Sequence, residues 1–450
     1  MSRNIVVIRL GALLAMGVAC VSVALAHQEP GDVTKEVEKI AAMSPDELRA
    51  YERRLVHELA NLELVPPWIT TNPPPRYAKA RQNFGMNGGI AETPKGRLWA
   101  VWFGGEDGPK AFAMAAYSDD RGETWSETAF VVDTHFPNNR IDWLPVQRSI
   151  KIAELWSDPK GRMHLFVNQS LASFDGRATT WEFVCENPDA DVPDWGKPRY
   201  IWHGGMHNKM LVLKDGTWLL PVELESDRGR VFPELDPLRG LGFFASTDEG
   251  KTWTKRGFTR PDHRHFAEQM AVERKDGTLW MLLRTGEGLM ESFSSDKGWT
   301  WTKPVLCANL KQPIARFSFI RLQSGNLLFV KNGNRANAIP YMRPDEKITW
   351  RRAQLTAFLS EDEGKTWIGG LELDGRDTPA YPDAMQAKDG TIFVTYEYNR
   401  TNKAKILCAR FTEEDVKAGK VVSPKSAMRL EVCAYDEKVG KAKEKKGKRR

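Results

Sequence analysis

Cysteine is scarce in this sequence, at five residues in 450. One of them, Cys20, lies in an apolar N-terminal stretch, which leaves Cys185, Cys307, Cys408 and Cys433 for the rest of the chain. The spacing of these four matches neither a zinc-binding pattern nor a Cys-x-x-Cys redox motif, so both of those protein classes are excluded. Disulfides and buried free thiols fit the sequence equally well.

Long hydrophobic runs are also lacking beyond the N-terminus, so we expect no membrane span in the rest of the chain. Residues 1–26 begin with a positive segment, continue with an apolar run from Leu10 to Leu25, and end in the small-x-small site Ala24-Leu25-Ala26. This order is typical of a cleaved secretory signal peptide, and the apolar run is short for a membrane anchor. We therefore expect a secreted or periplasmic protein.

The body of the chain lacks an excess of either charge. The formal net charge is +6, but the stretch from Lys438 to Arg450 holds eight basic residues and one Glu, so the remainder is close to −1. Residues 436–450 are predicted to form a basic disordered tail. A nearly neutral body argues against nucleic acid as the partner.

Residues 27–79 are predicted to form a helical extension and a Pro-rich linker. Ser44-Pro45-Asp46-Glu47 provides an N-cap, a proline in the first turn and early acidic residues. Leucines then recur at helical spacing, at Leu48, Leu55, Leu59 and Leu62. Two runs of proline follow, Pro66-Pro67 and Pro73-Pro74-Pro75, and these end the helix and stiffen the connection.

Tryptophan is abundant, with 16 residues, and four of these close an eight-residue pattern, S-x-D-x-G-x-T-W. We call each copy a box; the four boxes are Ser118–Trp125, Ser246–Trp253, Ser294–Trp301 and Ser360–Trp367. The Asp can accept hydrogen bonds from nearby backbone N–H groups, and the Gly allows a backbone conformation that side chains resist. The pattern predicts a repeated structural turn within a repeat fold, with no direct catalytic role.

A second repeat is a glycine-containing turn followed by an apolar strand. It occurs six times, at Gly96, Gly161, Gly216, Gly277, Gly325 and Gly390, with intervals of 48 to 65 residues. Each interval has room for four strands, and six such units suit a β-propeller. We therefore predict an all-β, six-bladed β-propeller over residues 80–435, preceded by a short N-terminal helical extension.

The boxes and the residues between them resemble the sialidase (exo-α-neuraminidase) superfamily over about residues 84–412. In that family a strand pair begins with a Glu and ends, after an Asp-Gly turn, with an Arg, and the stretch from Glu268 to Arg284 matches this pattern. The resemblance implies that Glu268 assists a tyrosine nucleophile and that Arg284 binds the substrate carboxylate. Arg352, eight residues before the last box, matches a second carboxylate-binding arginine.

The resemblance also implies a nucleophile and an acid/base residue. Tyr381, fourteen residues after Trp367, matches the nucleophile, and Asp107, eleven residues before Ser118, matches the acid/base Asp. A sialic acid carries a carboxylate on its anomeric carbon, which repels a carboxylate nucleophile but not a neutral phenol. Because a phenol titrates near 10, it needs a neighbouring base, the role that Glu268 would take.

One departure from the family concerns the first carboxylate-binding arginine. Sialidases open their propeller with an R-I-P triplet, whereas residues 84–90 contain no arginine. Asn87, His207 and Asn208 are polar residues in Gly-rich segments and are candidates to fill this gap. The identity of the sugar therefore stays open, and the candidates are a sialic acid, another 2-keto-3-deoxy acid and a uronic acid.

Each of these residues also has a structural interpretation. Glu268 and Arg284 could form a bridge that only stabilises the fold, Tyr381 could be a strand-end aromatic, and Asp107 could shape a Gly-rich turn. The histidines give no metal-ligand pattern, and we expect neither a metal nor another cofactor.

Taken together, the pattern predicts a secreted retaining exo-glycosidase of sialidase type that removes a terminal acidic sugar from a glycan. Two alternatives stay open: a polysaccharide lyase that acts on uronate-containing glycans, and a non-catalytic glycan-binding propeller. The sequence does not set the oligomeric state.

Overall fold

The structure is a computed structural model that describes residues 38–439, apart from 40–41, 109, 135–147, 172–176, 225–231, 263–265, 267 and 341–348. The predicted signal peptide, residues 1–26, and residues 440–450 of the predicted basic tail lie outside the described residues. None of the described helices is long and apolar enough to cross a membrane.

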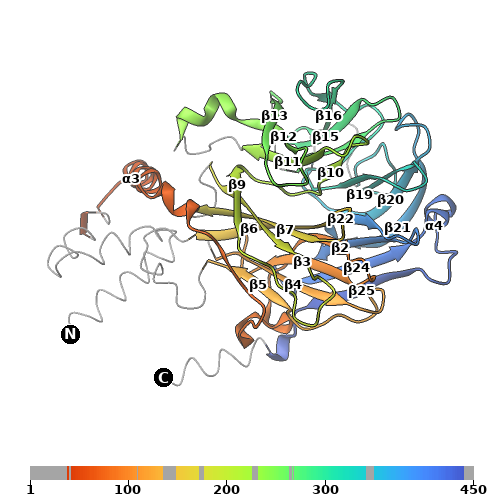
Figure 1. The fold of residues 1–450 in the computed structure, drawn as a ribbon, viewed down its shortest axis with the longest axis horizontal. Helices are drawn as coiled ribbons and strands as arrows, with labels where there is room; N and C mark the ends of the chain where they lie inside the picture. Colours follow the sequence, from red (N-terminus) through yellow and green to blue (C-terminus); the bar gives the residue numbers. More distant parts are fainter. Residues whose placement is uncertain are drawn as a thin grey trace.

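Six antiparallel sheets follow one another along the chain and form the six blades of a β-propeller (Figure 1). This confirms the fold class predicted from the two repeats. The first sheet, in spatial order, consists of β1 (Trp68–Thr70), β5 (Phe130–Asp133), β4 (Phe112–Ser118), β3 (Leu98–Gly104) and β2 (Met86–Glu92). The second consists of β6 (Arg148–Ser157), β7 (Met163–Leu171), β8 (Thr179–Cys185) and β9 (Arg199–His203).

The remaining four sheets each contain four consecutive strands. The third has β10 (Leu211–Val212), β11 (Trp218–Leu224), β12 (Gly240–Ser246) and β13 (Thr254–Thr259), and the fourth has β14 (Met270–Glu273), β15 (Leu279–Thr285), β16 (Gly288–Ser294) and β17 (Val305–Leu306). The fifth has β18 (Ser318–Arg321), β19 (Leu327–Asn332), β20 (Ala353–Ser360) and β21 (Ile368–Asp377), and the sixth has β22 (Ala380–Gln386), β23 (Ile392–Tyr398), β24 (Lys405–Phe411) and β25 (Ala427–Ala434).

The strand that precedes each glycine turn is the innermost strand of its blade. Residues of β2, β6, β10, β14, β18 and β22 together line one cavity at the centre of the ring. Because four antiparallel strands return the chain to the edge where it started, all six innermost strands begin at the same edge of the ring. We call that edge the strand-start rim, and the opposite edge, where the six glycine turns lie, the turn rim.

The boxes form turns between the third and fourth strands of their blades and therefore lie at the turn rim. In the box Ser294–Trp301, the Asp296 carboxylate accepts hydrogen bonds from Thr300 N at 2.8 Å and from Thr300 Oγ1 at 2.6 Å. The Ser294 hydroxyl accepts a bond from Gly298 N at 2.8 Å. The hydrogen bonds from Thr300 lower the pKa of Asp296 to about 2, so the turn is held by a carboxylate at neutral pH.

The apolar core lies between neighbouring blades and inside them. The β3 strand is buried along its whole length, because adjacent sheets cover both of its faces. The box tryptophans contribute to this packing: Trp301 stacks on Phe243 of the preceding blade, with ring centroids 5.5 Å apart. All four cysteines of the described residues are free and buried, so the structure selects the free-thiol alternative.

The N-terminal extension contains α3 (Pro45–Glu58), followed by the 3₁₀ turns η2 (Ala60–Leu64), η3 (Pro75–Tyr77) and η4 (Lys79–Arg81). Ser44 and Glu47 form the predicted capping interaction, with Ser44 N donating to Glu47 Oε2 at 2.8 Å. The buried Glu63 pairs with Arg177 at 2.7 Å and so attaches the extension to the second blade. The linker also contains β1, which pairs with β5 and which the proline pattern did not predict.

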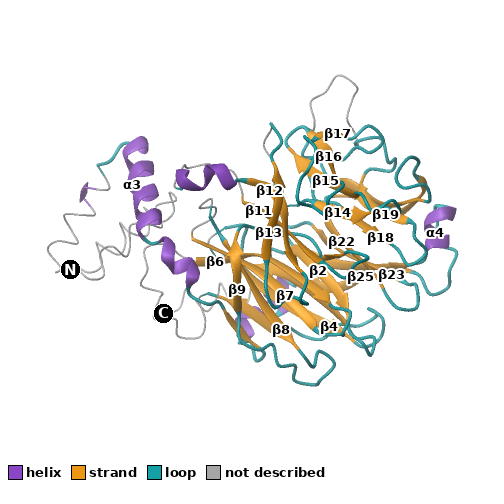
Figure 2. Cartoon of the chain, turned by 45° about the horizontal axis from the view of Figure 1, so that its top comes forward, coloured by secondary structure: helices purple, strands orange, loops and turns teal. Residues whose placement is uncertain are grey.

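Two further short elements lie between strands. One is η5 (Pro233–Leu238), which precedes β12, and the other is α4 (Glu413–Ala418), which follows β24. Figure 2 shows α3 and α4 at opposite sides of the molecule, with the blades between them.

Candidate functional site

Strand direction gathers the predicted site residues at the strand-start rim. Tyr381 lies at the beginning of β22, and Glu268 lies just before β14. Arg284 lies near the end of β15, which runs back to the same rim, and Arg352 just precedes β20, which starts there. Asp107 lies in the connection between β3 and β4, also at this rim.

The centre of the site is a three-residue cluster from two blades. The Tyr381 hydroxyl donates a hydrogen bond to Glu268 Oε1 at 2.7 Å. Arg284 Nη1 donates to both oxygens of Glu268, at 2.5 and 2.6 Å, and to the Tyr381 oxygen at 2.9 Å. The side chains of Arg284 and Glu268 are only 4% and 3% exposed, so this ion pair is sheltered from water. A phenol in this position has both a proton acceptor and a cation within hydrogen-bond distance.

Charge and burial set the protonation states around the phenol. Burial alone would raise the pKa of Glu268, but the positive charge of Arg284 outweighs it and lowers the pKa to about 2. Glu268 is therefore a carboxylate at neutral pH. The ring of His207 lies 6.5 Å from the Tyr381 ring, and burial lowers the pKa of His207 to about 3, so this imidazole is neutral.

The backbone at Tyr381 is strained. Its φ is 55°, a left-handed conformation that bulky side chains rarely adopt, and the register of β22 shifts between Ala380 and Asp383. The Asn87 side chain donates a hydrogen bond to the Tyr381 carbonyl at 2.8 Å and so holds the strained residue in place. Strain of this kind persists only where the surroundings fix it, and it is concentrated at functional sites.

Two more arginines lie beside the phenol ring. The guanidinium carbons of Arg352 and Arg400 are 4.9 and 4.1 Å from the centroid of the Tyr381 ring. Both arginines share Glu397: Arg352 Nη1 lies 3.6 Å and Arg400 Nε 2.7 Å from its Oε1. Their side chains are 18% and 16% exposed, and both line a cavity of about 680 Å³ together with Glu397 and Trp350.

Arg400 is the residue that sequence reasoning missed. It follows β23 in the last blade, and its carbonyl accepts a hydrogen bond from Gly85 N at 3.0 Å, inside the stretch that lacks the expected arginine. Arg400 thus brings a guanidinium close to the segment whose own sequence has none. The residues next to Arg400 in the sequence form no motif that predicts its position, because its contact with Gly85 joins the two ends of the propeller.

Arg351 and Arg352 are adjacent, and only one faces the site. Arg351 Nη2 lies 3.3 Å from Asp377, and both side chains are more than half exposed. Arg352 instead turns toward Tyr381.

Asp107 approaches the site from the first blade. Its side chain is 47% exposed, and its carboxylate lies 3.6 Å from Lys151 Nζ. The charge of Asp107 partly offsets the lowering of the His207 pKa by burial, and it adds to the larger effect of Glu397 in raising the pKa of Arg400, so Asp107 lies within electrostatic range of the cluster. The neighbouring Glu106 is held locally, because its carboxylate accepts a hydrogen bond from Lys110 N at 3.2 Å.

The two predicted asparagines lie behind the site, and both are buried. Asn87 N donates to Glu397 at 3.1 Å, in addition to the side-chain bond to Tyr381. Asn208 Nδ2 donates to the Gln269 carbonyl at 3.1 Å, next to Glu268 in the chain. These contacts are with protein groups, and they hold the backbone on either side of the phenol–carboxylate pair.

A buried ion cluster supports this layer. Arg316 Nε donates to Asn208 Oδ1 at 2.8 Å, and Arg316 Nη2 lies 2.9 Å from Glu154 Oε2. Lys209 pairs with Glu154 at 3.0 Å and also with Asp383. Burial and the negative charge of Asp383 raise the pKa of Glu154. Two cations and two carboxylates thus compensate one another at the centre of the ring.

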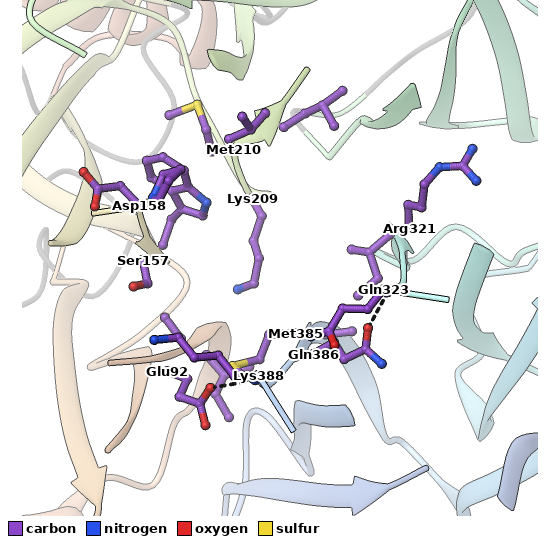
Figure 3. Close-up of a pocket in the computed structure, with 18 of the residues that line it drawn as sticks. Glu92, Ser157, Asp158, Lys209, Met210, Arg321, Gln323, Met385, Gln386 and Lys388 are labelled. Atoms are coloured by element: carbon purple, nitrogen blue, oxygen red, sulfur yellow. Dashed lines mark hydrogen bonds between the residues drawn. The ribbon is translucent and has the colours of Figure 1, made fainter. Parts of the chain in front are cut away.

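The cavity at the centre of the ring has a volume of about 580 Å³ and is separate from the cavity lined by Arg352 and Arg400 (Figure 3). It lies at the turn-rim side of the ion cluster. The Lys209 side chain lies in its middle, between a wall with Glu92 and Lys388 and a wall with Arg321 and Gln323. None of the predicted site residues lines this cavity. Within the described residues, no group of three or more His, Cys, Asp or Glu side chains could hold a metal ion.

Comparisons with known proteins agree with the fold. Residues 96–394 match a family model described as a BNR repeat-like domain. Among solved structures, the fold is similar to the Hadza microbial sialidase Hz136, with a TM-score of 0.57 and 17% identity over 75% of this chain and 67% of that one. No curated protein matches the sequence.

Two further solved structures are similar at low identity. The intramolecular trans-sialidase from Ruminococcus gnavus, in complex with oseltamivir carboxylate, has a TM-score of 0.56 and 15% identity over 79% of this chain and 99% of that one. The Trypanosoma rangeli sialidase in complex with sialic acid has a TM-score of 0.51 and 15% identity over 72% of this chain and 54% of that one. At such identities the likeness concerns the fold.

Proposed function

This chain belongs to the BNR repeat-like domain family, and from that premise we propose that it is a sialidase-type glycoside hydrolase that releases a terminal acidic sugar with retention of configuration. The observation that carries the proposal is the hydrogen-bonded cluster of Tyr381, Glu268 and Arg284. A buried phenol bonded at once to a carboxylate and a guanidinium is equipped to act as a nucleophile.

In the first half-reaction the Tyr381 oxygen attacks the anomeric carbon while the bond to the leaving oxygen breaks. Glu268 accepts the phenol proton, and Asp107 gives a proton to the leaving oxygen. Because the Asp107 side chain is half exposed, it can take up that proton from solvent. In the second half-reaction water attacks the same carbon and gives a proton to Asp107 while the bond to the Tyr381 oxygen breaks. Glu268 returns its proton to that oxygen and so restores the phenol.

Charge supports an acidic sugar as the substrate. Three arginines, Arg284, Arg352 and Arg400, surround the phenol, and among the described residues two carboxylates, Glu268 and Glu397, pair with them. These five side chains together carry one net positive charge. A sugar carboxylate would neutralise it, and the planar guanidinium groups of Arg352 and Arg400 suit such a partner.

The test is the Tyr381→Phe variant, which removes only the phenolic oxygen. We expect kcat on aryl glycosides of sialic acid, of other 2-keto-3-deoxy acids or of uronic acids to fall by about 10³-fold or more. The matched control is Tyr396→Phe, since Tyr396 is buried in the same blade and its hydroxyl lies 3.3 Å from Asp374. This control should keep its activity.

Three outcomes would contradict the proposal. Full turnover by Tyr381→Phe would show that Tyr381 is not the nucleophile. A product with a new double bond, which absorbs in the ultraviolet, would show a lyase in place of a hydrolase. Measurable binding of acidic glycans by the wild type without any turnover would show a non-catalytic glycan-binding propeller.

A further inference from the structure

A surface groove of about 610 Å³ runs along β13, the outermost strand of the third blade. It is lined by residues 236–239, residues 255–260 and Trp299, and we call it the β13 groove. It shares no lining residue with the cavity beside Tyr381. Since the candidate site is built on the strand-start rim around the inner strands, the β13 groove is a separate surface.

Trp299 is exposed in the groove without a role in its own box. It occupies the variable position between Gly and Thr, where the other three boxes have Glu123, Lys251 and Lys365. The hydrogen bonds of the turn are made by Ser294, Asp296 and Thr300, so the turn does not need the indole. Trp299 is nevertheless 52% exposed, which leaves much of its indole open to a ligand.

The groove also has an excess of positive charge. Within the described residues, Lys255, Arg256 and Arg260 form no ion pair with a carboxylate. The one acidic residue of the lining, Asp236, is already paired with Arg239 at 2.8 Å. Burial lowers the pKa of Arg256, and the nearby charges of Asp215 and Asp296 partly offset this, but neither carboxylate pairs with it directly. The lining of the groove thus keeps an excess of positive charge, a pattern that attracts an anionic ligand.

The cations and the indole form one surface. The guanidinium carbon of Arg256 lies 4.3 Å from the centroid of the Trp299 ring. Lys255 Nζ lies 4.5 Å from the centroid of the Phe258 ring, so a second cation is held against an aromatic group of the lining. A ligand that lies on the indole therefore meets positive charge directly beside it.

We propose that the β13 groove binds an acidic polysaccharide, with one sugar ring stacked on Trp299 and the acidic groups of the chain on Lys255, Arg256 and Arg260. A sugar ring presents an apolar C–H face to an indole while its acidic groups remain free for the cations. A single-stranded nucleic acid would need several aromatic platforms for successive bases, and the lining exposes one tryptophan.

The direction of β13 gives the groove a geometric relation to the rest of the ring. As a fourth strand, β13 starts at the turn rim and ends at the strand-start rim. Trp299 lies in a box at the turn rim, and η5, which precedes β12, lies at the strand-start rim. A chain in the groove therefore runs along the outside of the blade toward the rim of the candidate site. This inference concerns binding and does not require hydrolysis at Tyr381.

The experiment is affinity gel electrophoresis of the full chain through gels that contain polygalacturonate, polysialic acid or neutral dextran. We expect the wild type to be retarded by at least one acidic polymer and not by dextran. Trp299→Ala and the triple variant Lys255→Gln/Arg256→Gln/Arg260→Gln should each weaken the apparent binding at least 10-fold. The basic tail is common to all variants, so it contributes equally to each mobility.

The matched control is Trp68→Ala, because Trp68 is 56% exposed but lies in β1 of the first blade. This control should migrate as the wild type does. Thermal melting of each variant checks folding, and turnover of a small acidic aryl glycoside should be the same in Trp299→Ala and the wild type, since the groove is separate from Tyr381. A loss of that turnover would concern the proposed function and not the groove.

Three results would overturn the inference. One is equal retardation of Trp299→Ala and the wild type in the acidic gels. Another is retardation by dextran that equals retardation by the acidic polymers. A third is Trp299-dependent binding of a single-stranded oligonucleotide that is tighter than the binding of both acidic polysaccharides, which would assign the groove to a different polymer.

Discussion

The phenol of Tyr381 depends on the charge state of one residue, Glu268. The pKa of Glu268 is lowered to about 2 in the folded protein, against about 4.3 for an ordinary Glu. A group whose pKa is depressed on folding contributes stability above its unfolded pKa, and this contribution is lost as the pH falls through the folded pKa. The contribution of Glu268 should therefore be complete above about pH 5 and disappear between about pH 4 and pH 2.

The variant Glu268→Gln tests this dependence. We expect its free energy of unfolding to lie below that of the wild type by about 3 kcal/mol at neutral pH, because Arg284 is left buried without a carboxylate. The difference should shrink as the pH falls from 5 toward 2. The measurement is urea denaturation of both proteins at several pH values, and a difference that is constant over this range would contradict the assigned charge state.

Arg400 is the second residue on which the proposed chemistry depends. If it binds the sugar carboxylate, Arg400→Ala removes charge-assisted hydrogen bonds worth about 1.5–3 kcal/mol, which corresponds to a loss of about 10- to 150-fold in kcat/KM. The matched control is Arg351→Ala, since Arg351 is paired with Asp377 at the exposed edge of the same cavity.

Steady-state kinetics on an acidic aryl glycoside separates the two variants. Arg351→Ala should keep a kcat/KM close to that of the wild type. If Arg400→Ala keeps its kcat/KM as well while it remains folded, then Arg400 does not replace the missing arginine.

At the scale of single elements, the box turns join neighbouring blades as well as strands. Gly364, in the last box, has a φ of +86°, and a Cβ at this position would lie 2.2 Å from Trp280 of the preceding blade. Gly390, in a glycine turn, has a nearly identical φ of +85° but nothing within 4 Å of the corresponding position. A side chain at either position would therefore suffer the same backbone strain, but only at Gly364 would it also clash with Trp280.

Alanine substitutions at these two positions should separate the cost of the left-handed backbone from the cost of the clash with Trp280. Gly390→Ala should cost about 1 kcal/mol, from the left-handed backbone alone. Gly364→Ala should cost about 1–3 kcal/mol more, since Trp280 must move out of a packed interface. Urea denaturation measures both, and equal losses would show that the box does not pack between blades as described.

The same scale shows which parts of the fold are predictable from sequence. The six turn glycines repeat because each blade needs the same local backbone between its two innermost strands, so the number of blades follows from the sequence. The strand β1 escapes prediction because its pairing with β5 joins segments about 60 residues apart, and its own three residues carry no alternation. Arg400 escapes for the same reason: its place beside Tyr381 is fixed by the ring and not by its neighbours in the chain.

At the scale of the whole molecule, the ring closes without strand exchange. The first sheet is built only from N-terminal strands and the last only from β22 to β25, so no strand pairing joins these two blades. Side-chain contacts and isolated backbone hydrogen bonds, such as that from Gly85 N to the Arg400 carbonyl, join them instead. We call this boundary the closure seam. Asn87 of the first blade contacts Tyr381 and Glu397 of the last blade across it. Tyr381, at the centre of the candidate site, therefore lies at the boundary that joins the two ends of the propeller.

Because of this placement, we predict that urea abolishes activity before it unfolds the blades. Arg121 crosses the seam, donating to Asp389 at 2.8 and 2.9 Å and to Glu92 of its own blade at 3.1 Å. In Arg121→Ala, activity should be lost at a lower urea concentration than the one at which tryptophan fluorescence reports unfolding. The reason is that the closure seam opens locally while the blades stay folded. In the wild type the two transitions should lie closer together.

The matched control for the seam is Lys405→Ala. The ion pair of Lys405 with Glu431, at 2.6 Å, has similar exposure but lies within the last blade. Because this pair does not cross the seam, its loss should shift the activity and fluorescence transitions together and by less than about 1 kcal/mol. If Arg121→Ala also shifts both transitions together, the seam is no weaker than the other blade boundaries, and the position of Tyr381 on it has no consequence for the stability of the site.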